Sequence, residues 1–114
     1  MPTRYHLRLP DASRARGNDP TLAFRSQSAE GMATELQDAL RSDALFQRWR
    51  AQQDDPDGVD PALGATDPGA TVQGSLHGMH VELVAITSLS GNLLKQRLGW
   101  LAGSHWELRD VSAA

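Results

Sequence analysis

TVQGSLHGMHVELVAIT, residues 71–87, is the stretch of sequence that decides the fold. Two runs in which apolar and polar residues alternate flank His77 and Gly78. Glycine adopts positive φ freely, and histidine does so more often than most other residues, so this pair suits a two-residue turn. The stretch therefore predicts a β-hairpin that turns at His77 and Gly78, which is a sufficient role for His77.

A turn at that place sets the register of the two strands. The pairs predicted on the apolar face are Leu76 with Met79, Gly74 with Val81, and Val72 with Leu83. The pairs predicted on the polar face are Ser75 with His80, and Gln73 with Glu82. A slip of one residue would turn the apolar set toward water, so the alternation and the turn support the same arrangement.

Strands and helices are also predicted on either side of the hairpin. Residues 3–9 and 105–111 alternate as half-buried strands do. A helical region starts after Ser28, a suitable N-cap, and its apolar stripe breaks at residues 42–43, which predicts one kinked helix or two short ones. A second helical region carries leucines at helical spacing up to Gly103, a residue type common just past a helix end.

The predicted order is strand, helix, strand, strand, helix, strand. This is the order of the ferredoxin-like split βαβ arrangement (β-α-β-β-α-β), in which two helices cover one face of an antiparallel sheet. We therefore predict an α+β fold with the form of a two-layer sandwich, with an extra strand at 21–26 as an open alternative. At 114 residues, the chain is expected to form a single domain over residues 1–114.

A long acidic loop at 54–69 precedes the hairpin. It contains five aspartates, no basic residue and three Asp-Pro steps, and a proline disfavours helix immediately before it. Connections of this length are uncommon within compact domains and are often functional or mobile, so we predict a mobile loop. Residues 1–27 carry the opposite charge, with five arginines against two aspartates.

The composition argues against several classes of protein. Cysteine is absent, which excludes disulfides, thiol catalysis and cysteine-bound metals. No apolar run is long enough to span a membrane, and the first residues lack the apolar core of a signal peptide, so a cytoplasmic location is expected. A net charge of −3 disfavours nucleic-acid binding, which depends on neutralising phosphates. Ten arginines against one lysine indicate a GC-rich, and so bacterial, genome.

Motifs for catalysis and for cofactors are lacking as well. The sequence contains no G-x-S-x-G, no G-x-G-x-x-G and no P-loop, so we expect neither a catalytic residue nor a cofactor. RNA recognition on the face of a sheet would require aromatic side chains on which bases stack. The outward residues of the strand at 3–9 are instead Arg4, His6 and Arg8.

The histidines support a hypothesis of a metal site. In the predicted sheet, the strand that contains His6 lies beside the strand that contains His80 and Glu82, and all three residues face away from the helices. Imidazole and carboxylate ligands in this combination suit zinc or iron. Arg4 and Arg8 would lie close to them and would repel a cation, so an ordinary solvent-facing surface is the competing interpretation.

One pattern indicates an interaction surface. Val84 and Ile86 are apolar on the predicted outward face, so we expect the segment 10–27, the acidic loop or another subunit to cover them. We therefore predict a non-catalytic protein-interaction or regulatory module that binds a protein partner or itself, as a homodimer does. The predicted surface comprises Val84, Ile86, Arg4, His6 and Arg8. The alternative is a small enzyme, or a ligand- or metal-binding domain, that uses the histidines and the glutamate named above.

Overall fold

The computed structural model describes residues 2–114, which form four strands and three α-helices. The strands are β1 (Thr3–Leu9), β2 (Thr71–His77), β3 (His80–Thr87) and β4 (Glu107–Ala113). The helices are α1 (Ala29–Arg41), α2 (Ala44–Ala51) and α3 (Gly91–Ala102). Short 3₁₀ turns lie at Ala12–Arg14, Pro56–Gly58 and Pro61–Gly64.

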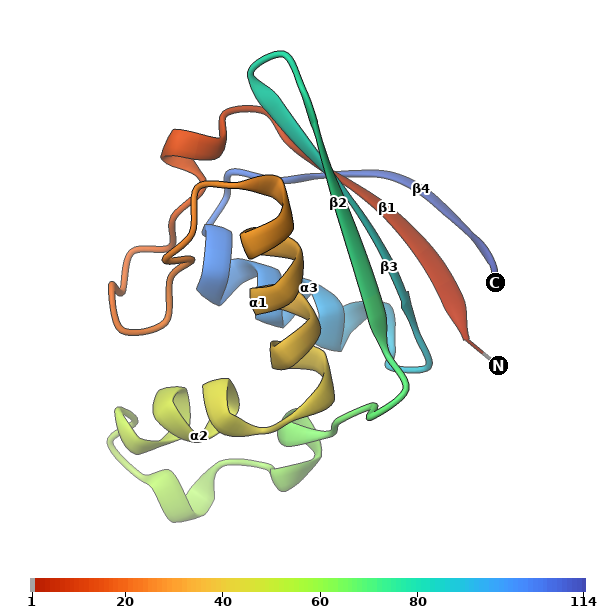
Figure 1. The fold of residues 1–114 in the computed structure, drawn as a ribbon. Coiled ribbons are helices and arrows are strands. Elements are labelled where there is room, and N and C mark those ends of the chain that lie inside the picture. Colours follow the sequence, from red (N-terminus) through yellow and green to blue (C-terminus); the bar gives the residue numbers. More distant parts are fainter. Residues whose placement is uncertain (1) are drawn as a thin grey trace.

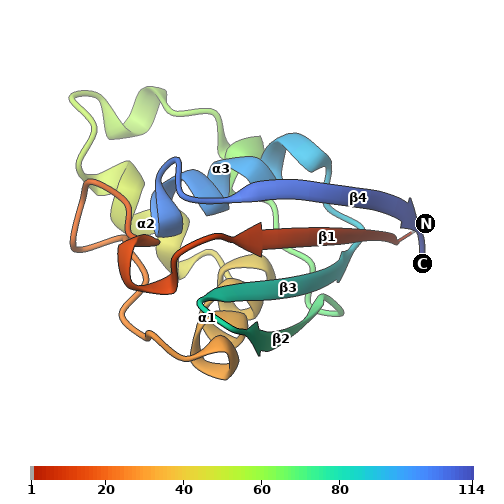
Figure 2. The ribbon, with the colours of Figure 1, turned by 90° about the horizontal axis from the view of Figure 1, so that it is seen from above.

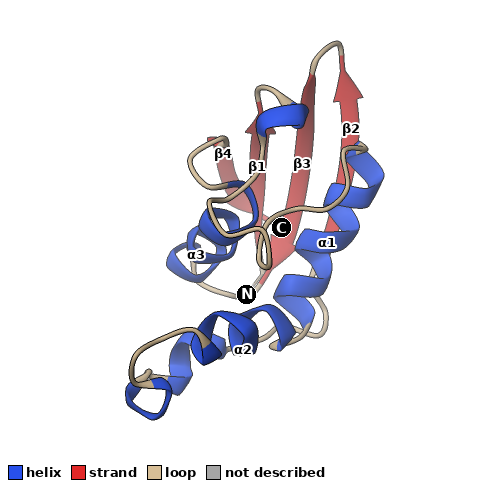
Figure 3. Cartoon of the chain, turned by 90° about the vertical axis from the view of Figure 1, so that its left-hand side faces the viewer, coloured by secondary structure: helices blue, strands red, loops and turns tan. Residues whose placement is uncertain are grey.

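The strands form one antiparallel sheet in the order β2-β3-β1-β4, which can be followed in Figure 2. All three helices lie on the same side of this sheet (Figure 1), and Figure 3 shows them in front of it, with α1 beside β2. The predicted α+β class is therefore confirmed. The core lies between sheet and helices, and its fully buried side chains include Leu7, Leu9, Met32, Leu36, Leu40, Val81, Leu83, Leu94 and Leu98.

The hairpin forms, but its turn lies one residue later than predicted. Gly78 and Met79 occupy the turn, and His77 pairs with His80. Gly78 alone has a positive φ, of 63°, as expected when glycine is the first central residue of a II′-type turn. Histidine at 77 therefore needs no unusual backbone conformation, and the predicted turn at His77 and Gly78 is wrong.

Moving the turn by one residue shifts every cross-strand pair by two. The observed pairs are Val72 with Ala85, Gly74 with Leu83, Leu76 with Val81, Gln73 with Val84, and Ser75 with Glu82. Because side chains alternate with a period of two, a shift of two leaves each strand residue on the face predicted for it. The predicted partners were therefore wrong and the faces of the strand residues were right, whereas Met79, predicted on the apolar face, lies exposed in the turn.

The first helical region consists of two helices. Ser28 caps α1 through its Oγ, which accepts a hydrogen bond from the N–H of Gly31 at 3.0 Å. The chain leaves the helical conformation at Ser42 and Asp43 and enters α2, so the break in the apolar stripe marks a true boundary. α2 packs against α3 through stacked rings of Trp49 and Trp100, with centroids 5.1 Å apart.

The segment 21–26 is not a strand, which corrects the alternative of an extra strand there. Its Leu22 and Phe24 are buried, as a strand would bury them, but its backbone bonds elsewhere. The N–H of Phe24 donates to the carbonyl of Leu101 at the end of α3, and the Glu35 carboxylate of α1 accepts from the next two amides. These partners replace the ladder that a strand would need.

The acidic loop at 54–69 is joined to the helical side by hydrogen bonds from three arginines. Arg50 donates to the carbonyl of Pro56, Arg97 to that of Ala65, and Arg41 to that of Ala70 just after the loop. At its end, Asp67 accepts hydrogen bonds from the hydroxyl of Thr87 and the N–H of Ser88. The loop therefore contacts both helical regions and the end of β3.

β4 is the outer strand of the sheet, and all seven of its residues are exposed. It starts two residues later than the predicted strand at 105–111 and runs on to Ala113. Its register with β1 shifts at Arg109, which has no partner, so the strand contains a bulge. Charged residues and a bulge are features that protect an edge strand from pairing with another chain.

Candidate functional site

The face of the sheet that points away from the helices is the candidate site, and we call it the open face. Its members are the outward residues of the four strands, identified from the pairing of the strands. They are Thr71, Gln73, Ser75 and His77 of β2; His80, Glu82, Val84 and Ile86 of β3; Arg4, His6 and Arg8 of β1; and Glu107, Asp110 and Ser112 of β4.

No segment of the described chain lies over this face. The segment 10–27 bonds to the end of α3, and the acidic loop bonds to α2 and α3, so both lie on the helical side (Figure 1). Val84 and Ile86 are half-buried between their neighbours in the sheet. Neither of the two segments of this chain that were considered as covers for Val84 and Ile86 therefore lies over them.

A cluster of histidines surrounds Glu82 near the hairpin turn. The Nε2 atom of His77 lies 3.0 Å from Oε2 of Glu82, and the Nε2 atom of His6 lies 3.6 Å from Oε1. The ring of His80 stacks on that of His77, with centroids 5.7 Å apart and an interplanar angle of 18°. We call these four residues the histidine–glutamate cluster.

The structure brings some of the predicted site residues together and not others. His6 and Glu82 are neighbours, as the predicted sheet required. His80 lies in the cluster through His77 and forms no ion pair with Glu82 within the described residues. His77 was missed because the turn was placed on it. The alternation of the strand was the available signal, since it puts His77 on the same face as Ser75.

The contacts of Ser75, His77 and Glu82 do not form a catalytic triad. The hydroxyl oxygen of Ser75 lies 2.9 Å from Nε2 of His77, which is the same nitrogen that faces Glu82. In a catalytic triad, one ring nitrogen of the histidine accepts the proton of the nucleophile, and the other ring nitrogen donates a hydrogen bond to the carboxylate. One nitrogen cannot serve both, and this arrangement does not activate Ser75.

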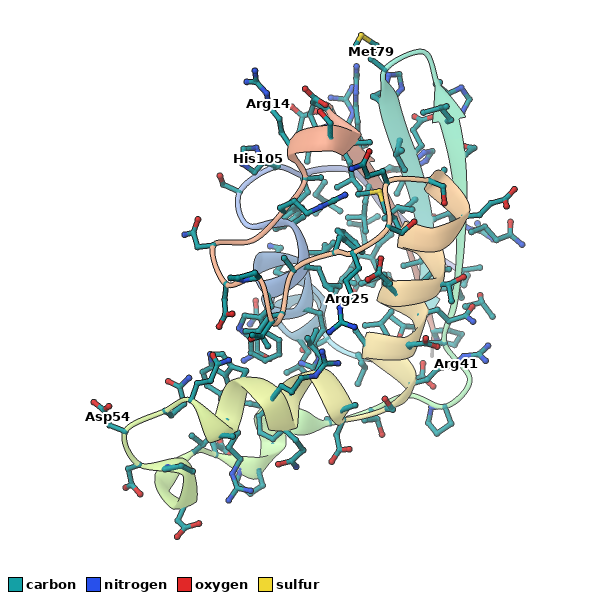
Figure 4. All side chains as sticks on the ribbon, turned by 60° about the vertical axis from the view of Figure 1, so that its left-hand side comes forward. Arg14, Arg25, Arg41, Asp54, Met79 and His105 are labelled. Carbon is teal, nitrogen blue, oxygen red and sulfur yellow. The ribbon has the colours of Figure 1, made fainter. Side chains whose placement is uncertain are left out.

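A pocket on the helical side is one of several concave features of the described chain that have charged walls. It encloses about 150 Å³, and its lining includes Leu22, Arg25, Glu35, Asp38 and Arg48. Ligand sites usually measure about 300–1,000 Å³, so this cavity is small. Two of its charged groups are already engaged, because Glu35 accepts from backbone amides and Arg48 donates to a backbone carbonyl. Arg25 is labelled in Figure 4, between α1 and α2. The open face is therefore the stronger candidate.

Comparison with known proteins adds no functional information. No protein-family model, curated protein or solved structure matches this chain. Among residues 2–114, no helix is both long enough and apolar enough to cross a membrane.

Proposed function

We propose that this protein is a non-catalytic interaction module that associates with a second copy of itself through the open face. The observation that carries the proposal is the uncovered apolar pair Val84 and Ile86 at the middle of a four-stranded sheet. The strand order β2-β3-β1-β4 supports a ferredoxin-like assignment, because each helix connection joins strands separated by one other strand. Sheet faces of that kind become buried when such domains pair face to face.

The charges of the open face favour a second copy as the occupant. Arg8 of β1 and Glu82 of β3 lie at the same level of adjacent strands. A twofold axis parallel to the strands and between β1 and β3 would place Arg8 of each copy over Glu82 of the other, and by the same geometry His6 over Val84 and Arg4 over Ile86. Such an interface is isologous, and it would bring opposite charges together twice.

Arg8 carries a second feature that supports this arrangement. Its Nε atom is buried and has no hydrogen-bond partner within the described chain. A buried donor without an acceptor costs free energy comparable to a lost hydrogen bond. The Glu82 carboxylate of a second copy would supply an acceptor at this point.

The size of the open face indicates weak association. Four strands spaced about 4.8 Å apart, each with about seven residues at about 3.3 Å, give a face of about 450 Å². A standard stable interface buries about 800 Å² of accessible surface per partner, so a face of this size is smaller than a stable dimer usually uses. Dimers should therefore be visible only at high protein concentration.

Sedimentation velocity over a range from about 10 µM to about 1 mM tests the proposal. We expect the mean mass to rise from monomer toward dimer in the unmodified protein. Val84→Glu should stay monomeric, because it places an unpaired charge at the centre of the buried face. Ala44→Glu adds the same charge at the exposed start of α2 and should associate normally.

Thermal melting of both variants checks that each is folded. A monomer at every concentration in the unmodified protein would overturn the proposal. So would dimerisation of folded Val84→Glu with the affinity of the unmodified chain.

A further inference from the structure

The pocket on the helical side is lined by two arginines and two carboxylates. Glu35 and Asp38 lie three residues apart on α1, so their side chains share one face of that helix. Arg25 belongs to the segment before α1, and Arg48 belongs to α2. Figure 4 shows the side chain of Arg25 between α1 and α2. Groups of both charges therefore reach the same pocket from three parts of the chain.

These four charged side chains do not neutralise one another. Within residues 2–114, every ion pair joins other residues, and none joins an arginine of this pocket to one of its carboxylates. In the same part of the chain, neither the guanidinium of Arg25 nor the carboxylate of Asp38 forms a hydrogen bond to protein. The pocket thus presents a cation and an anion that are both available to a ligand.

The other two charged groups are held in place and keep part of their bonding capacity. The oxygens of Glu35 each accept one backbone N–H, at 2.9 and 3.0 Å, and a carboxylate has about four acceptor positions. Arg48 donates from Nη1 to the carbonyl of Thr21, and its other N–H groups form no hydrogen bond within the described chain. Both side chains can therefore still bind a ligand.

The size of the pocket selects a small ligand with a short apolar part. Its volume is about 150 Å³, and a cavity of about that volume accommodates benzene, which has about six non-hydrogen atoms. The smallest α-amino acids have about as many. The rest of the lining is mostly apolar and includes Leu22, Ala39, Leu45 and Leu101.

We propose that this pocket binds a small α-amino acid as its zwitterion, with L-alanine as the reference ligand. Asp38 and Glu35 would bind the ammonium group, and the methyl group would contact the apolar lining. Arg25 and Arg48 would bind the carboxylate. The four side chains carry two positive and two negative charges, so a ligand with both charges compensates both pairs. A simple anion or cation would leave one pair without a partner.

An NMR titration of the backbone amides with L-alanine, up to about 50 mM, tests the proposal. The high limit is needed because Asp38 and both arginines are exposed, and water competes for exposed charges. We expect saturable shifts at the amides around the pocket. Asp38→Asn and Arg25→Gln each remove one charge at nearly constant shape and should lower the affinity at least about fivefold. Propionate and ethylamine, which each carry one of the two charges, should bind at least about fivefold more weakly.

Arg14→Gln and Asp54→Asn are the matched controls, because both residues are exposed and lie outside the pocket (Figure 4). Both variants should bind L-alanine as the unmodified protein does, and the spectrum of each variant shows whether it is folded. Absence of saturable shifts would overturn the proposal. Unchanged affinity in folded Asp38→Asn or Arg25→Gln, equal affinity for propionate or ethylamine, or loss of binding in a control would overturn it too. Because the open face lies on the other side of the sheet, self-association could fail its own test without affecting these results.

Discussion

Gly74 of β2 lies directly against the backbone carbonyl of Ala29, the first residue of α1. A β-carbon at position 74 would collide with that carbonyl, so the absence of a side chain lets the start of α1 approach the sheet. The same position faces Leu83 across the ladder. One glycine in the hairpin therefore sets the spacing between the two layers.

Gly74→Ala should destabilise the fold because neither backbone can move without disturbing a helix or a strand. We expect a loss of about 1–3 kcal/mol in the free energy of unfolding, measured by urea denaturation. Gly99→Ala is the matched control, since a β-carbon at this position in α3 meets nothing within 4 Å. It should stabilise by about 0.5–1 kcal/mol, as replacing glycine inside a helix does. Equal effects of the two substitutions would contradict the close approach of α1.

Arg97 gives a prediction for the acidic loop. Its side chain is fully buried, burial lowers its pKa, and it donates to the carbonyl of Ala65 at 2.8 Å. Arg97→Met removes both the desolvation cost of the charge and this hydrogen bond, so the free energy of unfolding should change by less than about 2 kcal/mol. Hydrogen exchange of the loop around Ala65 should nevertheless become faster, because local opening loses one of its restraints.

Lys95→Met, at an exposed position on the same helix, is the control for Arg97→Met. In Lys95→Met, the amides of the acidic loop should exchange hydrogen at the same rate as in the unmodified protein. Unchanged exchange around Ala65 in Arg97→Met would show that the arginine does not hold the loop. In both proteins, the tip of the loop near Asp54, which Figure 4 shows far from the sheet, should exchange fastest.

The sequence predicted the layers of this fold better than its contacts. Alternation places a residue on a face regardless of its partner, which is why Val81, Leu83 and Val84 were assigned correctly although the turn was misplaced. The position of the turn depended on which turn residue adopts a positive φ. Gly78 could do so either as the second turn residue, as predicted, or as the first, as observed. Met79 consequently lies exposed at the hairpin tip, labelled in Figure 4, and not in a pair with Leu76.

The candidate site was predictable only where it followed from the alternation. His6 and Glu82 come together because adjacent strands carry them on one face. The hydrogen bonds from arginines to carbonyls of the acidic loop join residues far apart in the chain, such as Arg97 and Ala65. No local pattern encodes such a bond, because any carbonyl can accept it and any nearby arginine can supply it.

Asp67 is a residue whose ionisation should make the stability of the fold depend on pH. The N–H of Ser88 donates to this carboxylate at 2.8 Å and lowers its pKa, and the hydroxyl of Thr87 and the N–H of Gly69 act in the same direction. A folded-state pKa below the unfolded value means that the ionised group stabilises the fold. This stabilisation is fully present above the unfolded pKa, about 3.9, and is lost as the pH falls through the lower folded value.

Asp67→Asn should therefore reduce the free energy of unfolding at neutral pH and narrow the difference between neutral pH and about pH 3. The amide can accept through one oxygen only, so it cannot satisfy the three donors that the carboxylate holds. Urea denaturation at the two pH values measures both effects. Asp54→Asn, at the exposed tip of the same loop, removes an equal charge and should leave the pH dependence nearly unchanged. Equal losses in the free energy of unfolding at neutral pH in the two variants would contradict this prediction. The change in net charge would then explain both losses, and the hydrogen bonds of Asp67 to Thr87 and Ser88 would not stabilise the fold.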